Sequence, residues 1–523
     1  MKKHLAQFFT KEIKKKSGFV SASAAKDPEV TSLEYDSRNV NSGSLFFALP
    51  GLHTDGSLYI DDAVSRGASV IVHENEIAKK KSDAAYIKVK NARFAMSPIS
   101  ASFYDFPSQQ LLVTGVTGTE GKSTTVYLIW QLLTLLGKKA GFISTVQHSL
   151  GEQENFNIEH QTTPEAPVVQ RLLREMADNG CEYAVLEASS HGLSPKTNRL
   201  GDVAFCSAVL TNVTHEHLEF HGTWEQYRED KANLFRALDR YTPNEIFKSF
   251  EPFGVINADD KASRFFAKAT RRKTFTYSPA GRDGDIVLEI IESSSQGNWY
   301  SVSVPAVKEH IDIRDRLPGA FNSGNVMASL LVVSNLLNLP LREITPHVNR
   351  LKPVKGRMTS VKKGQPFEVV VDYAHTPSSF QAIFPPLRSR LDKTNKKIIS
   401  LFGSAGERDT QKRSEQGSIA ANYSDIIILT DEDPRGENSM DILEEIAKGV
   451  DAAGDRTIFK REENLFLIPE RSCAIRKAFS LASEGDMVIL LGKGHENSII
   501  YKDKTMPFDE IGEAEKALDE MAR

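Results

Sequence analysis

The stretch Leu111–Lys139, LLVTGVTGTEGKSTTVYLIWQLLTLLGKK, constrains the fold of this chain more than any other. It begins with an apolar run, Leu111–Val116, of the kind found in buried parallel strands. A glycine-rich turn follows, and from Lys122 onward leucines recur at helical spacing. A strand, a glycine-rich turn and a helix in this order predict a phosphate-binding loop, because backbone N–H groups and the helix N-terminus then face the anion.

The loop departs at one position from the general pattern G-x-x-x-x-G-K-[ST]. The pattern places a glycine where this chain has Val116, and the glycines stand at 115, 118 and 121 instead. An ordinary tight turn between a strand and a helix is the alternative interpretation. In the phosphate-binding interpretation, Lys122 reaches the β- and γ-phosphates and the Ser123 hydroxyl binds Mg²⁺. The residues expected to surround the phosphates are Gly118, Thr119, Glu120, Gly121, Lys122, Ser123 and Thr124.

Composition argues against several classes of protein. The chain has 523 residues, of which 40% are hydrophobic and 26% charged, as in ordinary globular proteins. A net charge of −4 argues against a nucleic-acid-binding or membrane-surface protein. No apolar run approaches the roughly 20 residues that a membrane span needs, and the basic N-terminus lacks an apolar signal core. Three cysteines without metal-ligand spacing suit a reducing compartment, so we expect a cytoplasmic protein.

Strands and helices alternate along the chain, which predicts an α/β protein, and at ~150 residues per domain its length allows about three domains. We expect a small α/β domain over 1–107, a central P-loop domain with a mostly parallel sheet over 108–351, and a C-terminal Rossmann-like α/β domain over 352–523. The pattern in 277–304 is typical of an antiparallel side element. The other expected strands are 45–49, 68–73, 111–116, 180–186, 204–210, 254–257, 368–372, 397–402, 425–430 and 487–491, with helices at 61–66 and 326–337.

Two residues that follow strands of the central domain are candidates for metal binding. Glu187 and His217 both stand after the carboxyl end of an expected strand, at the edge of the sheet where the phosphate loop also lies. The Glu187 carboxylate suits Mg²⁺, which prefers oxygen ligands. His217 is a less usual Mg²⁺ ligand, and on the residues alone an ordinary loop histidine is the favoured interpretation.

Charged loops follow three strands of the C-terminal domain. They are FGSAGERD at 402–409, DEDPR at 431–435 and GKGHE at 492–496. Arginine can hold a carboxylate through two parallel hydrogen bonds. A solvated basic turn is the alternative for the first loop. Together the three loops predict a mixed-charge pocket suited to a zwitterion such as an amino acid.

Taken together, these motifs resemble those of the Mur ligases of peptidoglycan synthesis, over essentially the whole chain. The nearest resemblance is to the members that add the third, diamino residue of the stem peptide. The motifs are DSR at 36–38, TGVTGTEGKST at 114–124, TTPE at 162–165, EASSHGL at 187–193, TNVTHEHLEFHG at 211–222, YREDK at 227–231, NADD at 257–260, GAFNSGN at 319–325, GRM at 356–358, DYAHTP at 372–377, FGSAGERD, DEDPR and GKGHE. Any one alone is weak, and their joint order and spacing make the resemblance strong.

The resemblance implies a reaction and its substrates. Enzymes of this family have domains for the UDP-sugar, for ATP and for the incoming amino acid. They phosphorylate the terminal carboxylate of the nucleotide-linked peptide with ATP, and the amine of the new residue then attacks the acyl phosphate. The expected substrates are therefore a UDP-muramoyl-dipeptide, ATP and a diamino acid, with Mg²⁺ as cofactor. We expect a monomer with no nucleic-acid partner and no membrane insertion.

The resemblance also assigns roles to individual residues. The expected catalytic residues are Lys122, Glu187, His217 and Lys231, and the expected metal ligands are Ser123, Glu187, His217 and a carbamylated Lys231. Asn322, Asn325, Arg357 and Asp372 would contact the nucleotide. Ser37, Thr162, Thr163, Ser190 and Arg199 would bind the UDP-muramoyl-peptide, and Arg408, Asp433, Arg435, Gly492 and Glu496 the diamino acid. From the local sequence alone, Lys231 would be a surface residue of a helix.

Several positions depart from the family pattern. Glu120 replaces an asparagine in the phosphate loop, where an extra carboxylate needs a cation partner or must point away, and Thr359 replaces a glutamate. Asp433 stands where the diaminopimelate-adding members have asparagine. Arg435 suits a substrate carboxylate, and Asp433 and Glu496 suit a distal ammonium, so we favour meso-diaminopimelate. Lysine or ornithine fits if Arg435 holds the only carboxylate.

Two other functions compete with this interpretation. A folylpolyglutamate synthetase shares the ATP-binding and C-terminal domains but usually lacks a UDP-sugar domain, and residues 1–107 argue against it. A non-catalytic P-loop scaffold is the other alternative. The joint presence of Lys122, Glu187, His217 and Lys231 argues against that class.

Overall fold

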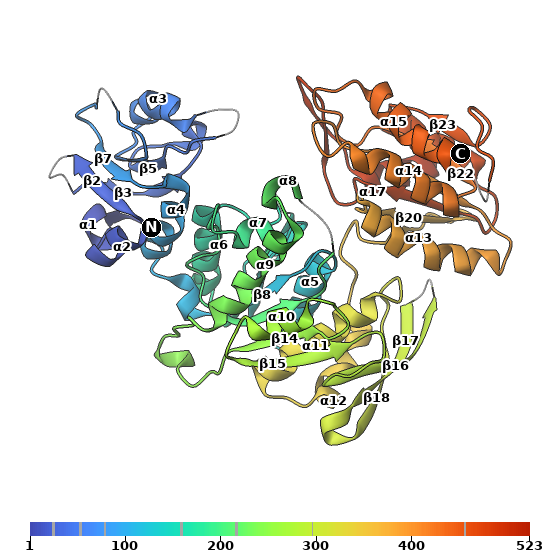
Figure 1. Ribbon diagram of the computed structural model, residues 1–523, viewed down its shortest axis with the longest axis horizontal. Helices are drawn as coiled ribbons and strands as arrows, with labels where there is room; N and C mark the ends of the chain where they lie inside the picture. The colour runs from blue at the N-terminus through green and yellow to red at the C-terminus, as the bar shows by residue number, and fades with distance from the viewer. Residues whose placement is uncertain are drawn as a thin grey trace. The chain divides into compact units, whose positions relative to one another are not determined.

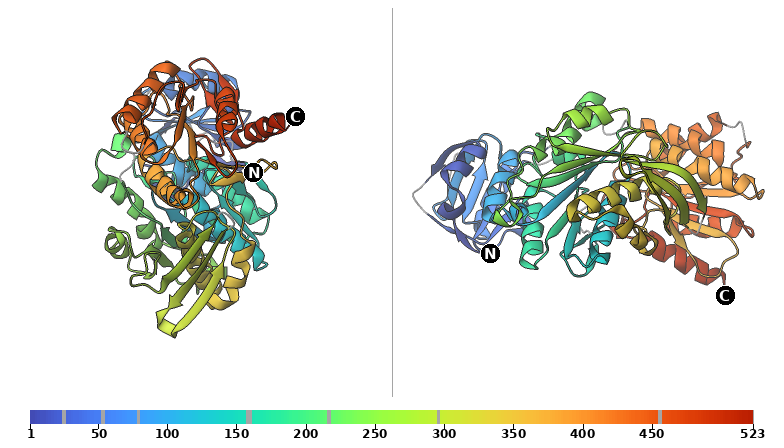
Figure 2. Two further views of the ribbon diagram at one scale, coloured as in Figure 1. Left: turned by 90° about the vertical axis from the view of Figure 1, so that its right-hand side faces the viewer. Right: turned by 90° about the horizontal axis from the view of Figure 1, so that it is seen from below.

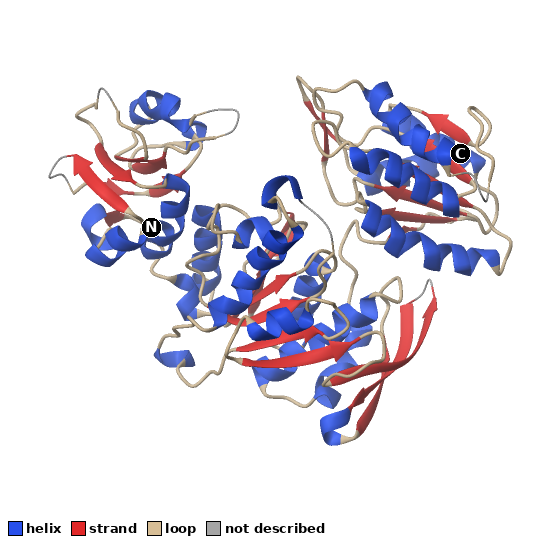
Figure 3. Ribbon diagram, viewed as in Figure 1, coloured by secondary structure: helices blue, strands red, loops and turns tan. Residues whose placement is uncertain are grey.

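The computed structural model describes residues 1–522 except 24–26, 52–54, 78–79, 157–160, 215–217, 295–296 and 454–456. By their internal contacts the residues form two compact units. The first comprises 1–291, 299–314 and 321–351, and the second 292–298, 315–320 and 352–523. Three large sheets with flanking helices make up the protein (Figures 1 and 3).

The N-terminal sheet has five strands in the order β2-β7-β6-β5-β4. Their bounds are β2 Phe19–Ser23, β7 Ala85–Val89, β6 Val70–His73, β5 Ser44–Phe47 and β4 Ser32–Glu34, and only β2 is antiparallel to its neighbour. Side chains alternate between the two faces, as in any strand. Leu45 and Phe47 pack with helix α4 (Ala92–Phe103), whereas Phe46 packs with helix α3 (Ile60–Ser65). The sheet therefore has an apolar cluster on each face.

The central sheet has eleven strands in the order β11-β10-β9-β12-β8-β13-β14-β15-β16-β17-β18. Their bounds are β8 Leu112–Thr117, β9 Ala140–Ile143, β10 Gln147–Ser149, β11 Glu154–Phe156, β12 Tyr183–Glu187, β13 Phe205–Leu210, β14 Phe253–Asn257, β15 Lys273–Ser278, β16 Ile286–Ser294, β17 Gly297–Val304 and β18 Glu309–Arg314. Neighbours from β9 to β16 are parallel, and toward the two edges the pairs β9–β10, β10–β11 and β17–β18 are antiparallel. The expected mostly parallel sheet with an antiparallel side element is confirmed. Its main helices are α5 Lys122–Leu135, α6 Ala166–Asp178, α9 Trp224–Leu238 and α11 Asn322–Leu337.

The C-terminal sheet has six strands in the order β19-β20-β24-β21-β22-β23. Their bounds are β19 Thr359–Val361, β20 Glu368–Asp372, β21 Ile398–Phe402, β22 Ile426–Leu429, β23 Leu465–Leu467 and β24 Met487–Leu491, and only β19 is antiparallel. Helices α13 Pro377–Asp392, α14 Gln411–Tyr423 and α15 Ser439–Ala452 cover one face, and α16 Arg471–Leu481 and α17 Glu510–Met521 the other (Figure 2). Val370 faces the first group, whereas Val369 and Val371 face the second. A sheet buried on both faces explains why its strands are nearly continuous apolar runs.

The smaller elements are β1 Lys3–His4, β3 Glu29–Val30, α1 Leu5–Phe8, α2 Lys11–Lys16, η1 Ser37–Asn39, α7 Ser190–Leu193, α8 Leu218–His221, α10 Ser263–Lys268, α12 Leu341–Ile344, β25 Ser498–Ile500 and β26 Thr505–Pro507. Within the described ranges, no single helix has the length and apolarity of a membrane span. One pair of helices, Asn322–Leu337 and Leu341–Arg350, meets those criteria only when joined across a bend of 107°. The α/β fold class is confirmed, and the domain bounds at 107 and 351 stay predictions.

Candidate active site

Two glycines of the phosphate loop lie where no other residue fits. Gly118 has φ +153°, and a Cβ built on it would lie 1.8 Å from Thr211 Oγ1. Gly121, the N-cap of α5, has φ +83°, and its Cβ would lie 2.6 Å from Asn325 Oδ1. A larger residue would be strained at both positions and would also displace its neighbours. The loop thus lies tightly between β13 and α11, with the N-terminus of α5 after it.

The backbone of Glu120 is fixed from two sides. Its N–H donates to Asn212 Oδ1 at 2.9 Å, and its carbonyl accepts from Thr211 Oγ1 at 2.6 Å and Asn212 Nδ2 at 3.2 Å. The N–H of Thr119 donates to the Asn212 carbonyl at 2.8 Å. The two residues that follow β13 therefore fix the shape of the loop, a role that the sequence did not assign to them.

A buried carboxylate lies against the first turn of α5. The Glu187 side chain is at the end of β12, and its Oε2 accepts from Ser123 Oγ at 2.8 Å, Thr145 N at 2.8 Å and Thr145 Oγ1 at 2.9 Å. The residue is 3% exposed. Lys122 Nζ donates a hydrogen bond to the Thr119 carbonyl at 2.7 Å. Thr124 lies in the same first turn of α5. The predicted neighbours Ser123 and Glu187 do meet, and their oxygens are the ligands that Mg²⁺ prefers.

Lys231 lies beside the phosphate loop and is only 1% exposed, so the surface position expected from its local sequence is wrong. Its Nζ donates to the Gly118 carbonyl at 2.6 Å and lies 4.4 Å from the centroid of the Tyr227 ring. The Tyr227 hydroxyl is 3.1 Å from Thr119 Oγ1. Tyr227, Lys231, Leu234 and Leu238 share one face of α9, and this spacing was a signal of burial. His217 lies outside the described residues.

Asn322 and Asn325 stand in the first turn of α11. Asn325 Nδ2 donates to Asn322 Oδ1 at 2.8 Å, and Asn325 Oδ1 accepts from Thr125 Oγ1 at 3.2 Å. The second bond joins α11 to α5, one turn after the phosphate loop. Both asparagines are therefore held close to Gly121 within the first unit.

A second group of predicted residues surrounds the start of α6 and α7. Thr163 Oγ1 donates to the Glu187 carbonyl at 2.9 Å and accepts from Ser189 N at 3.0 Å, and Arg199 Nη1 donates to the Thr163 carbonyl at 2.8 Å. The Glu165 carboxylate, 4% exposed, accepts from both Arg199 and Arg93 at 2.9 Å. The sequence did not predict Arg93 and Glu165 as residues of this site, because their partners are far away in the sequence. Thr162 is half-buried next to this group.

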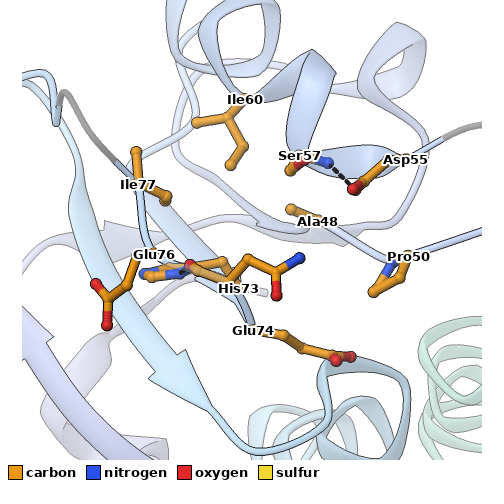
Figure 4. A pocket seen from close by; sticks show the side chains of 10 residues that line it. Ala48, Pro50, Asp55, Ser57, Ile60, His73, Glu74, Glu76 and Ile77 are labelled. Carbon is orange, nitrogen blue, oxygen red and sulfur yellow. Dashed lines mark hydrogen bonds between the residues drawn. The ribbon is translucent and has the colours of Figure 1, made fainter.

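Ser37 begins the η1 turn of the N-terminal domain and is buried. The same domain has a cavity of ≈ 50 Å³ between β5, β6 and α3 (Figure 4). Its lining includes Asp55, Ile60 and His73. Burial lowers the pKa of His73, whose Nε2 has no hydrogen-bond partner among the described residues. The cavity follows the strand ends, where the ligands of parallel sheets are usually found.

In the second unit, Asp372 ends β20 and is buried. Its carboxylate accepts from Met358 N at 2.6 Å and from Ala374 N at 2.7 Å. Burial raises the pKa of Asp372, and the nearby Arg357 opposes that shift. The Arg357 guanidinium lies 4.7 Å from the centroid of the Tyr373 ring. These contacts make the strand end a rigid turn.

A buried lysine corrects the charge expected for the amino-acid site. Lys493 is fully buried, and its Nζ contacts Asp433 Oδ1 at 2.8 Å and Glu496 Oε2 at 2.5 Å. Asp433 Oδ1 also accepts from Ile500 N at 3.0 Å. Burial opposes the charge of Lys493, but Glu496 and Asp433 outweigh burial and raise its pKa. The sequence suggested two free negative charges at Asp433 and Glu496. In the structure both carboxylates contact Lys493.

The other predicted residues of this site differ in exposure. Arg408 is exposed, whereas Arg435 is half-buried, has φ +54° and has no partner for its Nε among the described residues. Gly492 has φ +101°, and a Cβ there would lie 3.2 Å from Glu432 Oε2. Burial raises the pKa of Glu432, and this Oε2 also has no described partner. Glu432 was missed because the resemblance directed attention to its neighbour Asp433.

Comparisons with known proteins agree with this geometry. Three domain descriptions match in order: "Mur ligase family, catalytic domain" over residues 29–104, "Mur ligase middle domain" over 116–333 and "Mur ligase, glutamate ligase domain" over 356–494. The UDP-N-acetylmuramyl-tripeptide synthetase of Treponema denticola is 50% identical over 508 residues, 94% of each chain. The UDP-N-acetylmuramoyl-L-alanyl-D-glutamate–2,6-diaminopimelate ligase of Clostridium tetani is 35% identical and covers 98% of this chain and 99% of its own.

A solved structure of a UDP-N-acetylmuramoyl-L-alanyl-D-glutamate–2,6-diaminopimelate ligase is 26% identical, with a TM-score of 0.62 and 99% of each chain covered. The chain is thus a three-domain ATP-dependent ligase. It belongs to the Mur ligase family.

Proposed function

We propose that this protein uses ATP to join a diamino acid to the D-glutamate carboxylate of UDP-N-acetylmuramoyl-L-alanyl-D-glutamate, through an acyl phosphate, in peptidoglycan synthesis. The observation that carries the proposal is the 50% identity, over 94% of each chain, to a protein named UDP-N-acetylmuramyl-tripeptide synthetase. A carboxylate is a poor acylating agent, and phosphorylation supplies it with a leaving group. A chain that also covers the UDP-sugar domain of its relatives fits this substrate better than a folylpolyglutamate.

The phosphate loop is the proposed site of the ATP phosphates. The loop ends at the N-terminus of α5, whose positive end would face the phosphates, and Lys122 adds a cation. Mg²⁺, the proposed cofactor, would be held by Ser123 and Glu187, whose buried oxygens fit a hard cation, and by His217. When bound, it would neutralise charge on the transferred phosphoryl group. For the rest of the nucleotide we propose Asn322, Asn325, Arg357 and Asp372 as contacts.

Lys231 is the proposed site of carbamylation. Its ammonium would first lose a proton, and the neutral amine would then add to carbon dioxide, form an N–C bond and release a second proton, which turns a cation into a carboxylate able to serve a metal. The position of Nζ at the Gly118 carbonyl supports the proposal, because the modified group would lie at the phosphate loop.

We assign the UDP-muramoyl-peptide to Ser37, Thr162, Thr163, Ser190 and Arg199. Thr163 and Arg199 are joined through the Thr163 carbonyl, and Thr163 also contacts the backbone of Glu187. This connection would hold the substrate carboxylate close to the transferred phosphate. The cavity in the N-terminal domain would take part of the nucleotide end.

For the diamino acid we propose Arg408, Asp433, Arg435, Gly492 and Glu496 as contacts, and meso-diaminopimelate as the substrate. The half-buried Arg435, with an unpartnered Nε among the described residues, suits a second carboxylate. One lysine cannot neutralise two carboxylates, so Lys493, Asp433 and Glu496 together keep a negative charge that suits an added ammonium. The cytoplasmic location and the monomeric state stay predictions.

The test is a ligase assay with purified protein, ATP, Mg²⁺ and UDP-N-acetylmuramoyl-L-alanyl-D-glutamate. Meso-diaminopimelate, L-lysine and L-ornithine are supplied separately, and ADP and the mass of the product are measured. We expect the diaminopimelate tripeptide and one ADP per product. A clear preference for lysine or ornithine would refute the choice of amino acid, and ADP release without the dipeptide would refute the ligase function.

A further inference from the structure

A buried carboxylate joins α4 of the N-terminal domain to the predicted peptide site. Glu165 Oε1 accepts hydrogen bonds from Arg93 Nη1 and Arg199 Nη2, both at 2.9 Å. Arg199 Nη1 also donates to the Thr163 carbonyl at 2.8 Å. A guanidinium group stays protonated in proteins and only donates, so the direction of these bonds follows from the residue types. Glu165 is the N-cap of α6, but its side chain makes no cap hydrogen bond, so capping does not explain why this carboxylate is buried.

Helix α4 also holds the chain on both sides of Arg199. Asn198 Nδ2 donates to the Phe94 carbonyl at 3.0 Å, and the Asp202 N–H donates to Ser97 Oγ at 3.1 Å. Phe94 and Ser97 both belong to α4. The residues next to Arg199 and the carboxylate that its side chain contacts are therefore both held by this one helix.

The cluster of Arg93, Glu165 and Arg199 keeps a positive charge. Two guanidinium groups face one carboxylate, and neither arginine has a second acidic partner among the described residues. The side chains of Arg93 and Arg199 are 30% and 12% exposed, so water solvates this charge only in part. Glu165 Oε2 and Arg199 Nε also lack hydrogen-bond partners in the part of the chain that the structure describes. A surplus of charge in such a place is costly, and an anion beside the two arginines would offset it.

We propose that Arg93 and Glu165 are positioning residues, and that they orient Arg199 to bind the glutamate carboxylate that does not react. The inference rests on the proposed function, which assigns Arg199 to the UDP-muramoyl-dipeptide. The glutamate of that substrate has two carboxylates, of which one receives the phosphoryl group and the other stays free. A fixed guanidinium that binds the free carboxylate leaves only the other one to face the phosphate. The same contact would therefore select which carboxylate is activated.

Two variants act on the position of Arg199 without removing it. Glu165→Ala removes the acceptor that the two arginines share, and the KM for the UDP-muramoyl-dipeptide should rise at least about tenfold, as for one lost hydrogen bond to a charged group. Arg93→Met leaves Glu165 paired with Arg199, so no buried carboxylate loses its counter-charge, and the rise should be about three- to fivefold. The KM values for ATP and the diamino acid should stay within about twofold in both variants, because their sites are separate.

A substrate analogue separates the orientation of Arg199 from a general loss of structure. In this analogue a carboxamide replaces the glutamate carboxylate that does not react, which leaves no charge for Arg199 to bind. The wild type should have a KM for the analogue at least about tenfold above that for the natural dipeptide. In Glu165→Ala this ratio should fall to about twofold or less, because the natural dipeptide has already lost the contact. A general structural defect raises both KM values and leaves their ratio unchanged.

Arg174→Met is the matched control. Arg174 also stands on α6 and its side chain is 14% exposed, but its partners are Asp178 and Gln110 rather than Glu165. Its loss should change neither the KM for the natural dipeptide nor the ratio between the analogue and the dipeptide.

The wild type is assayed first with the natural dipeptide. If it does not use this substrate, the proposed function and the inference both fall. If the wild type is active, three results would overturn the inference alone: equal wild-type KM values for the dipeptide and its analogue, an unchanged KM in Glu165→Ala, or an unchanged ratio in that variant. If Glu165→Ala does not fold, Arg93→Met takes its place, and its ratio must fall by about three- to fivefold for the inference to stand.

Discussion

Arg471→Met is expected to destabilise the C-terminal domain strongly. The Arg471 and Glu510 side chains are both fully buried, and Nε and Nη2 of the arginine each donate to the carboxylate at 2.7 Å. Nη1 also donates to the Asp431 carbonyl at 2.9 Å, and Nη2 to the Leu491 carbonyl at 2.8 Å. Removal of one partner leaves a buried charge without its counter-charge, which costs about 3–5 kcal/mol.

The assay is differential scanning calorimetry of the full chain, with hydrogen exchange to follow α16 and α17. At about 2–4 °C per kcal/mol, the unfolding midpoint of this domain should fall by about 6–20 °C. The two carbonyls held by Arg471 stand just before the loops 432–435 and 492–496. The KM for the diamino acid should therefore rise in the same variant, with the KM for ATP less affected.

Two further variants make this prediction refutable. Arg471→Met combined with Glu510→Leu removes both charges and should be more stable than Arg471→Met alone. Arg476→Met is the matched control, because Arg476 joins the same two helices through Glu513 but is 34% exposed, so its loss should cost less than about 1 kcal/mol. If the double variant is as unstable as the sum of its two single variants, the reasoning from a coupled buried pair is wrong.

Three other variants test the proposed site. Lys122→Ala should lower kcat by about 10²–10³-fold or more, because the transferred phosphate loses a cation; single-turnover ADP release measures this. Lys231→Ala should be inactive and partly rescued by added short carboxylates, and wild-type turnover would contradict its role. Burial raises the pKa of Glu432 above its ordinary 4.5, so the wild type loses stability as pH rises through the folded pKa. Glu432→Gln has no such loss. Its free energy of unfolding in urea, relative to that of the wild type, should therefore increase from acid to neutral pH by about 1.4 kcal/mol for each unit by which folding raises the pKa of Glu432.

The strands and the phosphate loop could be predicted because their signals are local. The apolar run before Gly118 places β8 within a residue of its observed bounds, and the helical pattern places the start of α5 at Lys122, where it is observed. Strands β20 and β24 were predicted with their observed bounds for the same reason. Two-sided burial makes such strands continuous apolar runs that are easy to recognise.

The partners of the charged residues could not be predicted in this way. Lys493 meets Asp433, which is 60 positions earlier in the chain, and Glu165 meets Arg93 across 72 positions. No periodic pattern relates residues at such separations. The first pair meets because two strand-end loops of the C-terminal sheet lie together, and the second because α4 packs against α6. The burial of Lys231 is different, because the spacing of its apolar neighbours on α9 was visible in the sequence.

The central claim is that the peptide carboxylate is activated by the γ-phosphate of ATP. The most direct measurement uses UDP-N-acetylmuramoyl-L-alanyl-D-glutamate labelled with oxygen-18 in the glutamate carboxylate that receives the amine. Attack of the amine on the acyl phosphate breaks the bond between the carbonyl carbon and the bridging oxygen, which leaves with the phosphate. Mass spectrometry of the released phosphate should therefore find one labelled oxygen per phosphate. Phosphate without label, formed together with the tripeptide, would contradict the account.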